Sequence, residues 1–198
     1  MKPSPLSLER LEFSKVAVTA NPGFTPVSGG VFTQLDFDFK GINISRRARL
    51  RYPPEEAPDP KHFFCVFGIK ILQEDQKERP LPYEIDIEVS ALFTYLDGSL
   101  VGADRFRAVR FSAYQMLYGA LREMIATVTA RSRFGLLQLP SADFRQAAKS
   151  DSESDEAKRQ ETLAALPAPE VVIIPQESPE SAEATKPKRR KASRKLDV

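Results

Sequence analysis

The sequence predicts an α+β fold: a four-stranded antiparallel sheet, one long and one short C-terminal helix packed on it, and a disordered C-terminal tail. Three observations lead to this prediction. The first half of the chain alternates apolar and polar residues with the period of two that is typical of strands. The chain then changes to the three-and-four spacing of an amphipathic helix. From residue 150 onward it contains no aromatic residue.

Four stretches carry the strand period. In residues 83–95 the odd-numbered positions are apolar and the even-numbered ones are mostly polar. Residues 62–72 are apolar on both faces, so we expect both faces to be covered. Residues 42–52 alternate apolar side chains with Asn, Ser and Arg. Residues 8–20 change phase at Ser14-Lys15, which predicts a β-bulge or bend at that point.

The long helix is predicted to begin at Ser112, which forms a capping box with Gln115. Its apolar stripe is wider than one sheet face requires, and it consists of Tyr114, Leu117, Tyr118, Leu121, Ile125 and Val128, flanked by Ala113, Met116, Ala120 and Met124. The helix is expected to end near Ser132. A loop leads to a short second helix, for which Ser141 is the predicted cap.

One domain is predicted over residues 1–149, with a charged tail over 150–198. The tail buries too little apolar surface to offset the entropy of ordering it. Two segments within it are exceptions, of which the first, residues 156–166, is a candidate for a transient helix. Residues 171–174 are apolar and lie between prolines; they are either a chance run in a linker or a motif that adds a strand to a sheet edge. The basic C-terminus either contacts RNA, ribosomes or membranes, or only keeps the chain soluble.

The sequence offers little for catalysis. His62 and Cys65 are the only residues of their kinds, and on a strand their side chains point to opposite faces. We therefore interpret His62 as a strand-end residue and Cys65 as a core residue. The carboxylates of Glu84, Asp86 and Glu88 are interpreted as a solvated face, with a metal site as the alternative. No enzyme activity, cofactor or metal is expected.

Charge and targeting signals narrow the class of protein further. The net charge of +2 predicts no particular partner. Arg47, Arg49 and Arg51 alternate along one strand; they form either a solvated face or, with the basic tail, a nucleic-acid-binding module. A single cysteine, the lack of a signal peptide and the lack of an apolar run of ~20 residues predict a cytoplasmic chain without a membrane span.

Two segments near the helices resemble the SecB family of export chaperones. The long helix contains LREMIATVTARSRF (121–134), and LQLPSADF (137–144) follows it. The segment LERLEF (8–13), with Ala-Asn-Pro at 20–22, is similar to the first strand of that family. The resemblance spans about residues 6–148. It implies an ATP-independent chaperone that binds unfolded polypeptides, either for protein export or for a dedicated client such as an antitoxin.

The resemblance also implies surfaces for clients and for other subunits. The family holds clients in apolar grooves, for which the candidates here are Phe63, Phe67, Leu136, Leu137, Leu139 and Phe144; each of these is alternatively an ordinary core residue. The family forms homotetramers as dimers of dimers, and the candidate interface residues are Tyr114, Leu117, Tyr118, Gly119 and Leu121. A small residue such as Gly119 lets another backbone approach closely.

A third implied partner is the translocase motor, which docks on acidic residues of the sheet in export-type members. Asp86 is the candidate docking residue here. The aligned positions on the first strand hold Lys15 and Thr19 instead of acids. A lysine repels a basic docking element, which argues against general export and leaves client binding unaffected.

Overall fold

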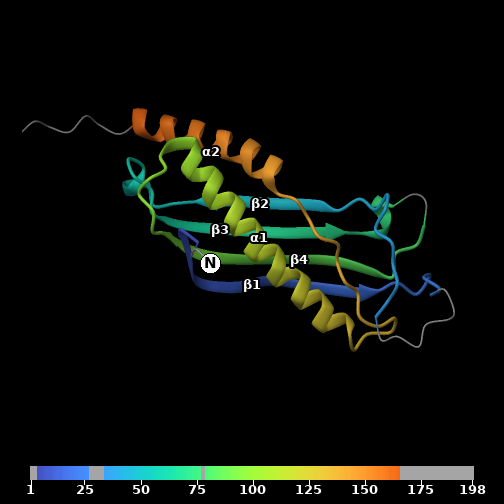
Figure 1. The fold of residues 1–198 in the computed structure, drawn as a ribbon. Helices are drawn as coiled ribbons and strands as arrows, with labels where there is room; N and C mark the ends of the chain where they lie inside the picture. Colours follow the sequence, from blue (N-terminus) through green and yellow to red (C-terminus); the bar gives the residue numbers. More distant parts are fainter. Residues whose placement is uncertain (1–3, 27–33, 77–78, 166–198) are drawn as a thin grey trace, which may run out of the picture. The chain divides into compact units, whose positions relative to one another are not determined.

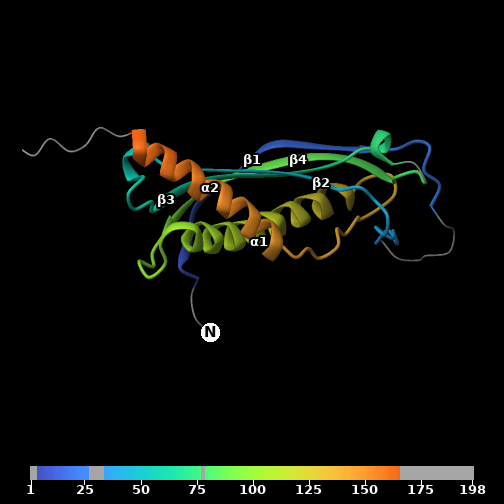
Figure 2. The same ribbon diagram turned by 90° about the horizontal axis from the view of Figure 1, so that it is seen from above.

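The computed structural model describes residues 4–26, 34–76 and 79–165 (Figure 1). Its antiparallel sheet has the strand order β1-β4-β3-β2 and consists of β1 (Leu6–Ala20), β2 (Ser45–Arg51), β3 (His62–Ile71) and β4 (Tyr83–Tyr95). The helices are α1 (Gly102–Thr129) and α2 (Arg145–Ala165), and short 3-10 turns occupy Pro54–Glu56 and Gln73–Asp75. Both α-helices lie on one face of the sheet (Figure 2). The predicted α+β fold is confirmed.

The helix-side face of the sheet supplies most of the core. Every odd-numbered residue of β4, from Tyr83 to Tyr95, is at most 4% exposed, as the sequence period predicts. The opposite face is different, because Phe64 of β3 and Leu92 of β4 are 37% and 44% exposed. Within the described chain only one face of β3 is therefore covered, whereas we expected both to be.

Strand β1 is longer than its partner β4 because it contains two bulges. The register shifts between Leu8 and Arg10 and again between Phe13 and Lys15. The second shift confirms the bulge that the sequence predicts at Ser14-Lys15. The first, at Glu9, was not anticipated, because a single extra residue so close to the strand start leaves no pattern before it.

Helix α1 begins at Gly102, well before the predicted start at Ser112. The φ of Gly102 is +56°, a left-handed conformation that favours glycine. Phe106 and Val109 continue the apolar stripe toward the N-terminus, and both are buried. Burial of this longer stripe against the sheet outweighs the preference of Ser112 for a cap position.

Helix α2 corrects two expectations. It begins at Arg145 instead of Ser141, and the side chain of Asp143 accepts a hydrogen bond from the Arg145 N–H at 2.9 Å. It is also 21 residues long, so residues 150–165, which we assigned to the tail, are helical. The rest of the predicted tail, 166–198, lies outside the described residues, as do the apolar run and the basic C-terminus.

Candidate functional site

Four aromatic rings from three elements meet between the sheet and the two helices. Phe67 projects from β3, and Tyr114 and Tyr118 project from successive turns of α1. Phe144 is the residue immediately before α2. The centroid of Phe144 lies 5.3–5.7 Å from the three other rings, and Phe67 and Tyr114 are 5.2 Å apart. These edge-on and tilted geometries are favourable for aromatic pairs. We call these four residues the aromatic cluster.

The structure places most of the predicted groove residues in the core. Phe63, Phe67, Leu137 and Leu139 are at most 2% exposed, and Phe144 is 7% exposed. In this conformation these five present almost no surface to a ligand. Leu136 is half-buried and lines an open hollow of about 530 Å³ beside Gly119 on the outer side of α1. Whether any of the six contacts a client stays a prediction.

The segment before α2 is held to the rest of the fold through tyrosine and threonine hydroxyls. Tyr118 donates a hydrogen bond to the carbonyl of Pro140 at 2.6 Å, and Tyr83 donates to the carbonyl of Gly135 at 2.9 Å. The N–H of Leu137 donates to Oγ1 of Thr129 at 2.8 Å. The loop is therefore attached by a few directional contacts, each to a different residue.

Helix α2 is attached by an ionic network whose Arg110–Asp155 pair is buried and whose Arg46–Asp151 pair is partly exposed. Arg110 of α1 donates two hydrogen bonds to Asp155, at 2.6 and 2.7 Å, in the bidentate geometry that makes such pairs strong. Tyr114 donates to Asp151 at 2.6 Å, and Arg46 of β2 donates to the same carboxylate at 2.8 Å. We call these five residues, Arg46, Arg110, Tyr114, Asp151 and Asp155, the α2 latch.

The pKa values in the latch reflect this pairing. Burial alone would lower the pKa of Arg110, but the hydrogen bonds and charge of Asp155 outweigh it and raise the pKa. Burial alone would raise the pKa of Asp151, but the hydrogen bonds from Arg46 and Tyr114 outweigh it and lower the pKa. Arg110 and Asp151 are therefore both charged at neutral pH.

Apolar packing contributes little to the attachment of α2. Its buried residues are Ala148, Ser152 and Asp155, of which only Ala148 is apolar. Near its C-terminal end Arg159 donates a hydrogen bond to the carbonyl of Ala57 at 3.1 Å. Helix α2, which follows Phe144 of the aromatic cluster, is thus bound mainly by charged and hydrogen-bonded side chains.

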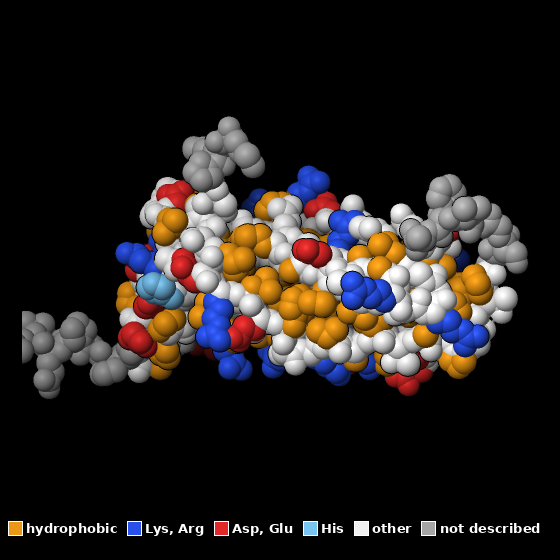
Figure 3. Space-filling view, turned by 90° about the horizontal axis from the view of Figure 1, so that it is seen from below, with side chains coloured by type: hydrophobic (Ala, Val, Ile, Leu, Met, Phe, Trp, Pro, Cys, Tyr) orange, Lys and Arg blue, Asp and Glu red, His pale blue; other side chains and the backbone are white. Residues whose placement is uncertain are grey.

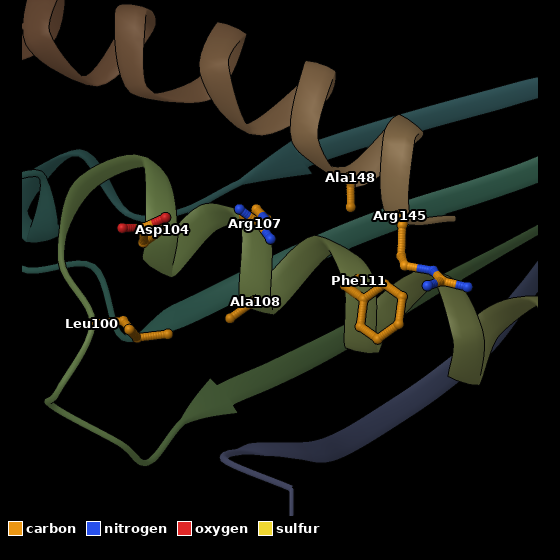
Figure 4. Close-up of a pocket in the computed structure, with 7 residues that line it drawn as sticks. All are labelled: Leu100, Asp104, Arg107, Ala108, Phe111, Arg145 and Ala148. Atoms are coloured by element: carbon orange, nitrogen blue, oxygen red, sulfur yellow. The ribbon is translucent and has the colours of Figure 1, made fainter. Parts of the chain in front are cut away.

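An open groove of about 470 Å³ runs between α1 and the start of α2 (Figure 4). Figure 4 shows Arg107 of α1 and Arg145 of α2 at its two sides, with Phe111 beside Arg145. The remaining lining residues are Leu100, Asp104, Ala108 and Ala148. Ala148 also belongs to the small buried face of α2. The groove therefore adjoins the contact between α1 and α2.

The predicted subunit-interface residues divide into two groups. Tyr114, Leu117, Tyr118 and Leu121 are buried between α1 and the sheet of the same chain. Gly119 lies on the outer side of the helix, where a Cβ atom would meet nothing within 4 Å. The wide apolar stripe is thus occupied within the chain. An interface role for these residues stays a prediction.

Another apolar surface follows the edge strand β1. Figure 3 views the molecule from below, on the β1 side, and shows hydrophobic side chains gathered along the middle of this face. Leu8 and Val16 of β1 are 41% and 44% exposed. Among the described strands β1 pairs only with β4, which leaves one edge of a 15-residue strand open.

The acidic residues on the outer face of the sheet are engaged by cations. Asp86 accepts hydrogen bonds from Lys15 and Arg47, both at 2.5 Å, and these outweigh the effect of burial and lower its pKa. Glu88 lies 3.7 Å from Arg49. The described residues contain no group of three or more His, Cys, Asp or Glu placed to hold a metal ion. Asp86 and Glu88 thus form an ion-paired face that is only partly solvated, with side chains 15% and 20% exposed.

The two residues with most catalytic potential occupy structural positions. Cys65 is fully buried, and burial raises the pKa of its thiol to about 12, so it is not a nucleophile at neutral pH. His62 is the first residue of β3, and its Nδ1 lies 2.6 Å from a carboxylate oxygen of Glu56. No helix in the described parts of the chain combines the length and apolar character needed to cross a membrane.

Sequence reasoning missed the latch. Arg110 lies between Phe106 and Tyr114 on the buried stripe of α1, and an arginine at such a position signals a buried partner. Asp151 and Asp155 are four residues apart, so they share one face of a helix. Those two signals together would have pointed to a second helix that continues past residue 149 and packs on α1.

Comparison with known proteins gives weak likenesses. No family model and no curated protein matches the chain. Among solved structures, the Mycobacterium tuberculosis SecB-like chaperone Rv1957, in complex with a ChAD peptide from the Rv1956 HigA1 antitoxin, has a TM-score of 0.48 and 15% identity and covers 69% of this chain and 90% of its own. A protein of unknown function from Streptococcus agalactiae has a TM-score of 0.41 and 15% identity, covering 69% and 97%. The proposals below rest on this chain's own residues.

Proposed function

We propose that this chain is a chaperone that binds unfolded polypeptide segments without nucleotide, using the aromatic cluster as its client site. One observation carries the proposal: four packed aromatic side chains lie where α2 begins, and α2 contributes one buried apolar residue to its own attachment. When α2 and Phe144 move away, Phe67, Tyr114 and Tyr118 become an apolar surface. Such a surface accepts many client sequences, because apolar contact is not directional.

The energetics favour exchange of α2 for a client. A buried ion pair contributes little net stability, because removing both charges from water costs almost as much as their attraction returns. A Leu or Phe side chain of a client returns about 1.5–3 kcal/mol when it is buried. Two or three such side chains therefore suffice to compete with α2 for the cluster.

The open groove beside α2 is the proposed entry point. It lies next to Ala148, and its rim carries Arg107 and Arg145 over a wall that includes Phe111. A client that first occupies this groove contacts α1 where α2 begins, and it then displaces α2 progressively. This route also gives Leu137 and Leu139, which are buried now, a way to reach the client once the loop moves.

The proposed assembly is a homo-oligomer, as the family resemblance implies, in the form of a dimer of dimers. The open edge of β1, with Leu8 and Val16 exposed, supports self-association. Gly119 supports a close contact on the outer side of α1. We place the protein in the cytoplasm, where unfolded clients are made.

A dedicated client, such as an antitoxin, fits the sheet better than general export does. Asp86, the predicted docking residue for a translocase motor, is already paired with Lys15 and Arg47, and its side chain is only 15% exposed. A basic docking element would have to displace two cations to reach it.

The test measures whether equimolar protein, without ATP, stops a chemically unfolded protein from aggregating on dilution. We expect suppression that survives ~0.5 M NaCl, because apolar contacts persist where charge contacts are screened. A photo-cross-linker at position 144 should capture the client, whereas one at exposed Arg131 should not. No suppression at any ratio would contradict the proposal. A gel shift with single-stranded RNA that disappears in Arg47→Ala/Arg49→Ala would instead favour the nucleic-acid alternative.

A further inference from the structure

The outer face of the sheet carries a second groove, which the proposed client site does not use. It consists of two adjoining hollows of about 360 and 200 Å³ that share Arg51 and Phe64. Its other outward-facing residues are Glu9, Arg49, His62, Val66, Leu92 and Thr94, and Tyr52, Pro53, Phe63 and Phe93 complete the lining. We call it the outer groove.

The floor of the outer groove follows from the strand register. Phe64 pairs with Leu92 on one side and with Arg51 on the other, and Leu92 pairs in turn with Arg10. One row across the sheet thus reads Arg51, Phe64, Leu92, Arg10, with two exposed apolar side chains between two arginines. At the ordinary strand spacing the two arginine backbones lie about 14 Å apart.

The rest of this face is built differently. Arg47 and Lys15 share the carboxylate of Asp86, and Glu88 lies next to Arg49. There, cations and anions satisfy one another and no large apolar side chain is exposed. We call this part of the outer face, with its paired charges, the ionic half, and the part around Phe64 and Leu92 the apolar half. The charged groups of the ionic half are engaged with one another, whereas the apolar half exposes surface that a partner can cover.

Arg51 is the decisive residue of the apolar half. Among the described residues its side chain makes no ion pair or hydrogen bond, and it borders both hollows. Arg49, beside it, is 3.7 Å from Glu88, which is longer than a hydrogen bond. Arg10 pairs only with its exposed neighbour Glu12. Glu9 is the one carboxylate in the lining, and it is exposed on the β1 side.

We propose that the outer groove docks an acidic segment of a partner protein that carries a large apolar side chain. The apolar side chain occupies the floor between Phe64 and Leu92, and a carboxylate on one side of it pairs with Arg51. Charge complementarity favours an acidic partner, because the cation that lacks a partner among the described residues, Arg51, lies on β2 at the edge of the groove. A nucleic acid fits less well, since Arg47 and Arg49 already face acids and Phe64 is the only aromatic ring exposed on the floor.

The experiment measures fluorescence anisotropy of a labelled peptide with a Phe-Leu centre flanked on each side by Asp-Glu, titrated with the full chain. We expect a Kd of about 10–100 μM at low salt, because the surface is small. Arg51→Glu and Leu92→Asp should each weaken binding about tenfold or more, and Arg131→Glu, a charge reversal at another exposed arginine, should change it less than twofold. Suppression of client aggregation should be unchanged in Arg51→Glu.

Four results would each overturn the proposal. The first is equal binding of a peptide in which lysines replace the acids. The second is peptide binding that neither outer-groove variant alters. The third is tight binding of a single-stranded oligonucleotide that Arg51→Glu abolishes. The fourth is a dimer that Arg51→Glu dissociates in sedimentation, which would make the groove a contact between two copies of this chain.

Discussion

Helix α1 presents eight buried apolar side chains to the rest of the fold, whereas α2 presents one, together with Ser152 and Asp155. Both helices lie on the same face of one sheet (Figure 2). Apolar packing is non-directional and insensitive to charge screening, so α1 and the sheet form a permanent unit. An ionic attachment depends on a few atoms in one geometry and responds to pH and partners. The difference is the basis for the proposed release of α2.

Asp155→Ala should have the largest effect on the attachment of α2. It leaves the guanidinium of Arg110, which is 5% exposed, with only the longer 3.8 Å contact to Asp151, and removing one partner of a buried ion pair costs about 3–5 kcal/mol. We expect hydrogen exchange to show loss of protection along α2 but not along α1. The double variant Arg110→Met/Asp155→Leu is the control, and it should recover most of the loss. A loss below ~1 kcal/mol in the single variant would mean that the latch does not hold α2.

Leu117→Ala tests the other helix. Leu117 is fully buried between α1 and the sheet, and a truncation of this kind costs about 2–5 kcal/mol. Urea unfolding should show the loss across the whole domain, with the same size at 0.05 and 0.5 M NaCl. A loss of stability that is confined to α1, or one that varies with salt concentration, would contradict the idea that apolar packing attaches α1 whereas charges attach α2.

Acidification should release α2 before the rest of the fold. The pKa of Asp151 is lowered in the folded state, so its contribution is complete above the ordinary carboxyl pKa of about 3.9 and is lost as pH falls through the lowered value. Limited proteolysis between pH 6 and pH 2.5 should cut α2 first. Asp151→Asn should remove part of this pH dependence, and an unchanged profile in that variant would assign it to other carboxylates.

Arg46→Gln should have the smallest effect. The ion pair of Arg46 with Asp151 is partly exposed, with side chains 32% and 27% accessible, and such pairs contribute at most about 1 kcal/mol. Thermal unfolding should shift by a few degrees at most, and the shift should vanish at high salt. A shift as large as that of Asp155→Ala would place the main attachment of α2 on β2 instead of α1.

The sequence predicted the sheet well because its signals are local. The period of two in β4 defines its bounds and its buried face, and both are confirmed. The phase slip at Ser14-Lys15 marks a real bulge. The start of α1 was misplaced because the capping box at Ser112 is a local signal that the longer stripe through Phe106 overrides.

The candidate site was harder to predict for a physical reason. Helix α2 lacks an apolar stripe, since its buried face consists of Ala148, Ser152 and Asp155, so its sequence reads as a polar tail. The aromatic residues were recognised individually, but a single sequence does not show which of them are covered. Phe144 is buried because α2 and the loop hold it in place, and both depend on contacts between residues 22 to 51 positions apart.

The two bulges of β1 fix how this edge of the sheet tolerates changes in chain length. They allow 15 residues of β1 to pair with 13 of β4, from Leu6 opposite Tyr95 to Ala20 opposite Tyr83. Deleting Glu9 and Ser14 together would leave a regular strand of the same length as β4. All the remaining side chains of β1 would stay on the face of the sheet that they occupy now. Deleting either residue alone keeps each flank in register only if the other bulge stays. Single-residue insertions and deletions in this strand are therefore absorbed at two known positions.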